Sequence, residues 1–192
     1  RIQGHLAIPL NDTGLWQAER LGQALAGEAV AAIYTSDLQR AHATAQAVAR
    51  TTGAPLTPEP GLRERSFGHF QGRTFAEIQA ELPEEARLWR TRDPHYTPEG
   101  GESLVTLRDR IERTVTALAT QHPGEQIVVV AHGGVLDVLY RLATRQDIQA
   151  PRTWQLSNAA INRLLWTEGG LTLVGWADTQ HLDGAARDET HT

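Results

Sequence analysis

The sequence predicts a single α/β domain in three layers, with helices on both faces of a mostly parallel central sheet. Short apolar runs rich in β-branched residues alternate along the chain with segments of helical periodicity, which is typical of consecutive βαβ units. The two clearest runs, residues 30–35 and 126–131, lack polar alternation, as in strands that are covered on both faces. A chain of 192 residues is long enough to form one continuous hydrophobic core.

Capping residues and periodicity predict the elements of the first half. Residues 11–13, Asn-Asp-Thr, precede apolar residues that recur at helical spacing from 15 to 25, which predicts a helix. Residues 30–35 then form the first buried strand. A second helix is expected from Asp37 to about Thr52, because the glycine that follows at position 53 is favoured after a helix end.

The second half continues the alternation. Thr74 and Glu77 have the spacing of a capping box and predict a helix start. The longest apolar stripe begins near Ser103, and residues 126–131 give the strongest strand signal of the chain. Residues 161–167 and 171–177 flank two glycines and predict a β-hairpin.

The predicted domain covers residues 1–177, and the polar residues 178–192 are expected to form a C-terminal tail. A formal net charge of −5 argues against a nucleic-acid partner. The absence of cysteine excludes disulfides and thiolate zinc sites. No apolar run approaches the length of a membrane span, and a cytoplasmic location is the default expectation.

His132 is the first candidate functional residue. It directly follows an apolar strand and precedes Gly133 and Gly134, the place at which open α/β sheets bind their ligands. The glycines let backbone N–H groups approach an anion, and the N-terminus of the next helix favours negative charge. By itself the segment is equally compatible with a structural histidine at a strand end.

Residues 35–41, Thr-Ser-Asp-Leu-Gln-Arg-Ala, form a second junction between strand and helix. Ser36 or Asp37 is suited to cap the helix, and Arg40 lies one turn inside it. A guanidinium can give phosphate two parallel N–H donors. Taken alone, however, Arg40 fits a solvent-facing helical arginine better than a ligand-binding one.

Residues 62–72, Leu-Arg-Glu-Arg-Ser-Phe-Gly-His-Phe-Gln-Gly, place Glu64 between two arginines. A cluster of this kind is usually a solvated surface network. The spaced glycines and aromatic residues indicate a shaped loop without specifying its chemistry.

The order of these segments is more informative than any one of them. The motifs YTSDLQRAHATA, LRERSFGHFQG, PEGGES and VVVAHGG follow one another as they do in the histidine phosphatase superfamily, which includes the phosphoglycerate mutases. The opening residues, RIQGHLAIPLNDTGLWQA, resemble the segment that follows that family's N-terminal Arg-His-Gly signature. The chain resembles this superfamily over residues 1–177, and its broad-specificity phosphatase branch most closely. The resemblance implies a phosphoglycerate mutase-like fold.

The resemblance also implies roles for individual residues. In this family two histidines and two arginines surround the transferred phosphoryl group. The histidine of the Arg-His-Gly signature becomes phosphohistidine, while a glutamate protonates the leaving oxygen. Arg40 matches the arginine of the Thr-Ser-x-Leu-x-Arg motif, Glu64 matches the acid, and His132 matches the second histidine. The positions implied to contact the substrate are Gln3, Gly4, Arg65 and Gly133.

Two departures from the family pattern stand out. The Arg-His-Gly signature and the strand before it are not among the 192 residues. Loss of a central strand would expose unpaired edges on both of its neighbours, so we expect the complete protein to carry this segment upstream of Arg1. At position 7, where relatives often have aspartate, this chain has alanine, which bears on substrate preference.

The sequence therefore predicts a phosphomonoesterase that hydrolyses small phosphorylated metabolites through phosphohistidine, as a monomer or homodimer. No metal or other cofactor is expected, because Arg40, His132 and the two absent family residues can neutralise a phosphoryl group, a task otherwise given to Mg²⁺. No Asp/Glu cluster with metal-binding spacing accompanies the motifs.

Two other functions stay open. A cofactor-dependent phosphoglycerate mutase would return the phosphoryl group to its substrate. The mutases carry a substantial insertion between the loop with the glutamate acid and the second histidine. In this chain only residues 84–98 could form a lid over the site. A more open site favours hydrolysis. The other possibility is an inactive phosphate-binding pseudoenzyme that begins at Arg1.

Overall fold

The computed structural model describes residues 1–183. Its helices are α1 (Asp12–Leu25), α2 (Gln39–Thr52), α3 (Phe75–Glu81), α4 (Pro83–Arg90), α5 (Leu104–Thr120) and α6 (Gly133–Thr144). Its strands are β1 (Ala32–Thr35), β2 (Leu56–Pro58), β3 (Ile127–Val130), β4 (Ile161–Thr167) and β5 (Gly170–Asp178). The short 3₁₀ helices are η1 (Pro60–Leu62), η2 (Gly68–Phe70) and η3 (Gln180–Leu182). Within the described residues no helix is both long and apolar enough to cross a membrane.

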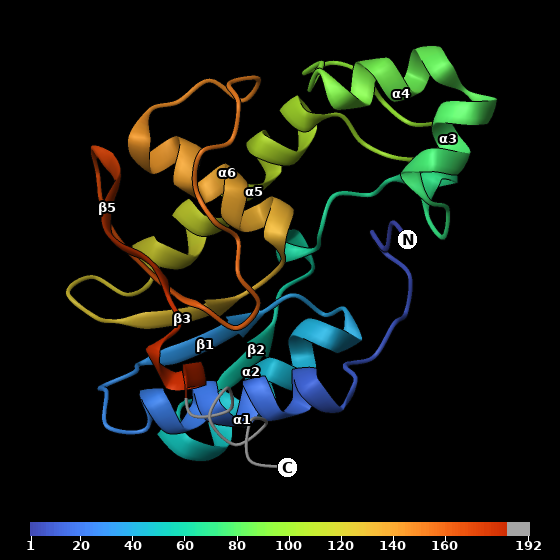
Figure 1. Ribbon diagram of the computed structural model, residues 1–192. Helices are drawn as coiled ribbons and strands as arrows, with labels where there is room; N and C mark the ends of the chain where they lie inside the picture. The colour runs from blue at the N-terminus through green and yellow to red at the C-terminus, as the bar shows by residue number, and fades with distance from the viewer. Residues whose placement is uncertain (184–192) are drawn as a thin grey trace.

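The central sheet has the strand order β2-β1-β3, and both pairings are parallel. Helices α1 and α2 lie on one side of this sheet, and α5 and α6 lie on the other (Figure 1). The strands β4 and β5 form a separate antiparallel pair, in which β5 packs against α6. The predicted three-layer α/β/α fold with a parallel central sheet is thus confirmed.

Two apolar clusters hold the layers together. One lies between β1 and the α1–α2 pair, and its fully buried members include Ile33 and Val48. The other lies between α5 and α6, around Leu107, Ile111 and Val138. Complete burial of an aliphatic side chain contributes about 1.5–3 kcal/mol relative to exposure, so these clusters are the main source of stability.

Three helix starts that the sequence predicts are confirmed by their caps. The side chains of Asn11, Thr74 and Ser103 each accept a backbone N–H from the first turn of the following helix. At α3 the reciprocal bond from the Glu77 side chain completes the capping box. The predicted hairpin is also present, with Gly170 at φ +114° at its turn.

The start of α2 differs from the prediction. The helix begins at Gln39, and its N-cap residue, Leu38, makes no side-chain cap bond. Ser36 and Asp37 do not cap the first turn: Ser36 Oγ accepts the N–H of Leu38 at 3.3 Å and contacts His132, and Asp37 accepts two hydrogen bonds of 2.6 Å from Arg63. The capping prediction for these two residues is therefore wrong.

Strand β3 is present where the sequence predicts it, but its residues are only half-buried. The reason is its place in the sheet: within the part of the chain that the structure describes, β3 is paired with β1 and has no strand on its other side. The apolar run suits a central strand, whereas the described sheet leaves it at an edge.

Regular secondary structure extends a few residues beyond position 177. Strand β5 ends at Asp178, and η3 follows and packs against α1. There Arg20 Nε donates to the carbonyl oxygen of His181 at 2.9 Å. The remainder of the predicted tail, residues 184–192, lies outside the described residues.

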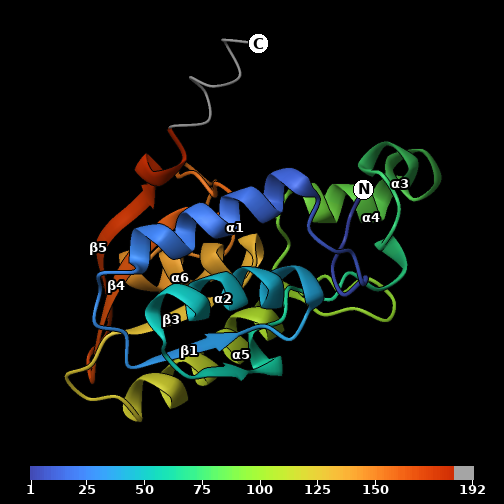
Figure 2. The ribbon, with the colours of Figure 1, turned by 90° about the horizontal axis from the view of Figure 1, so that it is seen from below.

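Helices α3 and α4 stand apart from the three layers, at one end of the molecule (Figures 1 and 2). Together with η2 they form a small unit, here called the cap (residues 68–96). It has its own apolar centre, formed by Phe70, Ile78 and Ala86. The start of the chain runs beside it, and the carbonyl oxygen of Ile2 accepts the N–H of Gly72 at 2.7 Å.

Candidate active site

His132 is the N-cap residue of α6 and lies two positions after the end of β3. Its side chain is buried, and Nε2 lies 2.7 Å from Oγ of Ser36, which follows β1. The N–H of Ser36 donates to the carbonyl of Val130, so the two parallel strand ends bring the imidazole and the hydroxyl together. Burial, and then the charge of Arg40, lowers the pKa of His132 to about 3. The ring is therefore neutral at physiological pH.

Arg40 lies in the first turn of α2 and binds the start of the chain. Its Nη2 donates to the carbonyl of Gly4 at 2.8 Å, and its Nη1 donates to the carbonyl of Leu6 at 3.2 Å. Gly4 has a φ of +52°, and a Cβ there would lie 2.3 Å from the side-chain oxygen of Gln71, so the segment requires glycine. Gly4, which the resemblance implies to contact the substrate, thus accepts a hydrogen bond from Arg40 in the structure.

The charge of Arg40 interacts with both of the other predicted site residues. Burial lowers the pKa of Arg40, while the negative charge of Glu64 opposes this shift. The same guanidinium is one cause of the depressed pKa of His132. A charge acts in this way only over short distances, so the fold gathers Arg40, Glu64 and His132 from three separate segments.

Glu64 rests against the N-terminus of α6. Its Oε2 accepts the N–H of Gly134 at 3.0 Å, and its Oε1 accepts the N–H of Arg65 at 2.9 Å. A Cβ on Gly134 would lie 2.3 Å from Oε1, so the missing side chain makes room for the carboxylate. The carboxyl group of Glu64 is thus held by two backbone N–H groups and lies at the N-terminus of α6, beside His132.

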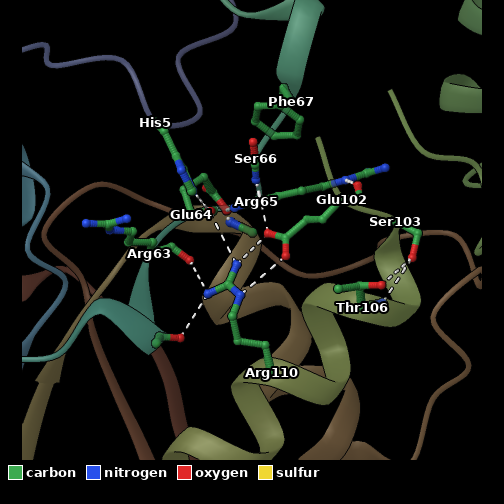
Figure 3. A network of polar contacts seen from close by, with 12 residues as sticks. His5, Arg63, Glu64, Arg65, Ser66, Phe67, Glu102, Ser103, Thr106 and Arg110 are labelled. Atoms are coloured by element: carbon green, nitrogen blue, oxygen red, sulfur yellow. Dashed lines mark hydrogen bonds and ion pairs between the residues drawn. The ribbon is translucent and has the colours of Figure 1, made fainter. Parts of the chain in front are cut away.

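The backbone around Glu64, here called the acid loop (residues 59–66), is held by Arg110 of α5 (Figure 3). Arg110 Nη1 donates to the carbonyls of Gly61 and Arg63 at 2.9 and 2.8 Å. Its Nη2 donates to the carbonyl of Glu64 at 3.4 Å and to Oε1 of Glu102 at 2.5 Å. One guanidinium therefore contacts three carbonyls of this loop.

His5 contacts the same loop from the start of the chain (Figure 3). Its Nε2 lies 2.7 Å from the carbonyl of Glu64, and its backbone N–H donates to the side-chain oxygen of Gln71 at 3.0 Å. Sequence reasoning did not identify His5 or Arg110. Glu102 belongs to the PEGGES motif, but Arg110 is one of several arginines on the polar face of a helix, and only its contacts distinguish it.

The remaining predicted substrate contacts are placed differently. The guanidinium of Arg65 is buried and directed to the cap: Nε donates to the carbonyl of Glu102 at 2.9 Å, and its central carbon lies 5.0 Å from the ring centre of Trp89. Burial lowers the pKa of Arg65 to about 10. Gln3 and Gly133 are exposed. Gly133 adjoins the site through His132 and Gly134, whereas Arg65 is bound by cap residues.

Other features of the described residues offer no competing centre. Residues 1–183 contain no group of three or more His, Asp or Glu side chains that could hold a metal ion. A cavity of about 280 Å³ lies between α5, α6 and the β4–β5 turn, where Glu112, Arg145 and Trp166 line it. None of the predicted site residues contributes to that cavity.

Comparison with known proteins agrees with this arrangement. Residues 1–179 match the family model for the histidine phosphatase superfamily (branch 1). The chain is 36% identical to phosphoglycerate mutase-like protein 4 of Arabidopsis thaliana over 95% of its own length and 80% of the relative's. It is 37% identical to a metal-independent phosphoserine phosphatase of the same plant, over 95% of this chain and 76% of the relative.

A solved structure shows the same fold. Mycobacterial glucosyl-3-phosphoglycerate phosphatase in complex with VO3 superposes with a TM-score of 0.82 at 30% identity, covering 93% of this chain and 91% of the other. The match of fold, motif order and nearly complete length leads to one conclusion: this chain belongs to the histidine phosphatase superfamily.

Proposed function

We propose that this protein hydrolyses phosphate monoesters of small metabolites through a phosphohistidine intermediate. The observation that carries the proposal is the position of Glu64, whose carboxyl group lies 3.0 Å from the N–H of Gly134, at the helix that His132 begins. A phosphoryl group bound beside it would meet the guanidinium of Arg40, the imidazole of His132 and the N-terminus of α6. These are donors suited to the charge of a transferring phosphoryl group.

The proposed reaction has two steps. A histidine nitrogen attacks phosphorus, the bond from phosphorus to the ester oxygen breaks, and Glu64 gives its proton to that oxygen. Water then attacks phosphorus, Glu64 takes a proton from this water, and the bond from phosphorus to nitrogen breaks. Arg40 and His132 hold the phosphoryl oxygens in both steps, so the same residues stabilise both transition states.

We further propose that the attacking histidine belongs to a strand that pairs with the open edge of β3. Within the described residues β3 has a neighbour on one side only, and unpaired strand edges are normally covered in native proteins. A parallel strand at that edge would end beside His132, since the carboxyl ends of parallel strands meet at one edge of a sheet. This agrees with the expected Arg-His-Gly segment upstream of Arg1.

The substrate would lie between this site and the cap. Two of the three relatives named above are a phosphoserine phosphatase and a glucosyl-3-phosphoglycerate phosphatase, and their names indicate phosphate esters of small hydroxyl compounds as substrates. For this chain we propose an ester of the same general class. The exposed side chain of Gln3 and the backbone of Gly133 are the proposed contacts to its body.

The first prediction tests the reaction itself. Purified full-length protein is expected to release inorganic phosphate from phosphoserine and sugar phosphates, with the same rate before and after dialysis against EDTA. The reason is that Arg40 and His132 supply the charge stabilisation that Mg²⁺ supplies in other phosphatases. Loss of activity in EDTA that returns with added metal would contradict the mechanism. Interconversion of 2- and 3-phosphoglycerate without phosphate release would favour the mutase alternative, which the name of one relative keeps open.

The second prediction concerns the proposed acid. Glu64→Gln is expected to slow turnover of alkyl phosphates by about 10²–10⁴-fold, because their alkoxide leaving groups need a proton. With p-nitrophenyl phosphate the loss is expected to be much smaller, since p-nitrophenolate leaves without protonation. Steady-state rates with both substrates decide the matter, and equal losses on both would argue against Glu64 as the acid.

The third prediction concerns the nucleophile. The protein is allowed to react briefly with ³²P-labelled substrate and is then quenched with alkali, which preserves phosphohistidine. Peptide mapping is expected to find the label on a histidine that is not among the 192 residues of this sequence. The neutral ring of His132 already contacts Ser36, and His5 is bound to the acid loop, so neither is expected to carry label. Label on either residue would overturn the proposed strand.

A further inference from the structure

We propose that Arg110 is a positioning residue for Glu64: it binds the acid loop so that the Glu64 carboxyl group faces the N-terminus of α6. The inference rests on the proposed function, because it takes Glu64 as the acid. It goes beyond the residue roles that the resemblance implies, which do not include Arg110.

The geometry of the loop carries the inference. The carbonyls of Gly61, Arg63 and Glu64 all point at the guanidinium of Arg110, at 2.9, 2.8 and 3.4 Å. The carbonyl of Glu64 thus lies between Arg110 and Nε2 of His5, which is 2.7 Å from it, while the Glu64 side chain reaches Gly134 in α6. These contacts fix the orientation of the peptide group that follows Glu64. The orientation of this peptide group sets the direction in which the Glu64 side chain leaves the backbone.

A carboxylate secures Arg110 and extends the contact beyond Glu64. Oε1 of Glu102 accepts from Arg110 Nη2 at 2.5 Å and from the N–H of Ser66 at 3.0 Å. The side chains of Arg110 and Glu102 are 19% and 15% exposed, so water screens this pair only weakly. The acid loop is therefore held on both sides of Glu64, by Arg110 before it and by Glu102 after it (Figure 3).

Only arginine can make this set of bonds. Its planar guanidinium carries five N–H donors in a fixed fork, whereas a lysine has three donors on a single nitrogen. An ammonium group at position 110 would keep the positive charge beside Glu102 but could not reach three carbonyls and a carboxylate together. The substitution Arg110→Lys therefore separates the bonding pattern of Arg110 from its charge.

The experiment compares leaving groups in the full-length protein. Arg110→Lys is expected to lower kcat with an alkyl phosphate by about 10–100-fold, the usual effect of removing an outer positioning contact. With p-nitrophenyl phosphate the loss is expected to be only a few-fold, because that leaving group does not need a well-placed acid. KM is expected to change little for either substrate. The control is Arg113→Lys, because Arg113 is exposed on the same helix and its side chain makes no hydrogen bond within the described residues.

Coupling to Glu64 gives the second measurement. In a Glu64→Gln background, Arg110→Lys is expected to cause no further loss that depends on the leaving group, because the acid it positions is already gone. Glu102→Gln, which keeps an oxygen for Ser66 but loses the charge, is expected to give a weaker form of the Arg110→Lys pattern and serves if that variant does not fold. Equal losses on both substrates, or full additivity with Glu64→Gln, would overturn the role of Arg110. If Glu64→Gln itself shows no dependence on the leaving group, the proposed function fails instead.

Discussion

Replacing Asp137 by alanine is expected to lower the free energy of unfolding by about 3–5 kcal/mol, the usual effect of breaking a buried ion pair from one side. Asp137 lies on α6 and is only 2% exposed. Its carboxylate accepts hydrogen bonds from Arg141 at 2.9 Å and from Arg92, Arg152 and Trp154 at 3.1 Å. Removal would leave four donors without their acceptor, among them the charge of Arg141, which is itself 3% exposed.

The substitution Asp137→Ala is expected to destabilise the cap as well. Arg92 follows α4, has a φ of +55°, and links the cap to α6 through Asp137 and to the carbonyl of Ile148 at 2.9 Å. Without Asp137, the cap loses one of its anchors to the three-layer body. Hydrogen exchange of cap amides is expected to rise in Asp137→Ala under native conditions.

Urea denaturation of the full-length protein measures the stability change. The control is Asp109→Ala, because the side chain of Asp109 is 56% exposed and, among residues 1–183, forms an ion pair with its neighbour Arg108 alone, at 3.3 Å. That substitution is expected to cost no more than about 0.5 kcal/mol. A loss below about 1 kcal/mol for Asp137→Ala would show that solvent replaces the carboxylate and that the cluster is less enclosed than the structure indicates.

Replacing His132 by asparagine is expected to lower phosphatase activity by about 10²–10³-fold, with similar losses for alkyl phosphates and p-nitrophenyl phosphate. Asparagine keeps a donor near Ser36 but cannot place it where the imidazole does. His132 is proposed to hold phosphoryl oxygens rather than to protonate the leaving group, so its loss should not depend on that group. The control is His95→Asn, since His95 is exposed in the cap. A strong dependence on the leaving group would assign the acid role to His132 instead of Glu64.

The same variant tests the depressed pKa. The pKa of His132 is lowered from its ordinary value of 6.5 to about 3, chiefly by burial. Between these values the unfolded chain binds a proton at this position and the folded chain does not, so the stability contributed by His132 is present above pH 6.5 and is lost as the pH falls toward 3. Each pKa unit corresponds to about 1.4 kcal/mol. The stability of His132→Asn is therefore expected to depend less steeply on pH over this range, and parallel curves would contradict the buried neutral ring.

The sequence by itself determined the elements whose signals are local. Capping residues such as Thr74 and Ser103 marked helix starts because their bonds lie within one turn. The apolar runs marked β1 and β3, and motif order predicted that Arg40, Glu64 and His132 share a site. These three residues come after strands of one parallel sheet, and such a sheet brings the carboxyl ends of its strands to the same edge.

Only the tertiary structure decided how side chains with several possible partners are used. Ser36 and Asp37 looked like caps, but a hydroxyl and a carboxylate can bind any nearby donor, and His132 and Arg63 come from distant segments to provide one. The sequence predicts Arg65 as a substrate contact, and in the structure its guanidinium donates to the carbonyls of Glu102 and Tyr96.

Arg110 and Asp137 gave no signal for the same reason. Arg110 has other arginines beside it in sequence that look alike, and what separates it from Arg113 is three carbonyls that lie more than forty positions away in the chain. Asp137 stands among apolar residues of α6, and its partners Arg92, Arg152 and Trp154 come from outside that helix. Periodicity reports which face of a helix is apolar, because that depends on spacing along one element. The partner of a polar side chain depends on which loop the packing of other elements brings beside it, and no local pattern encodes that.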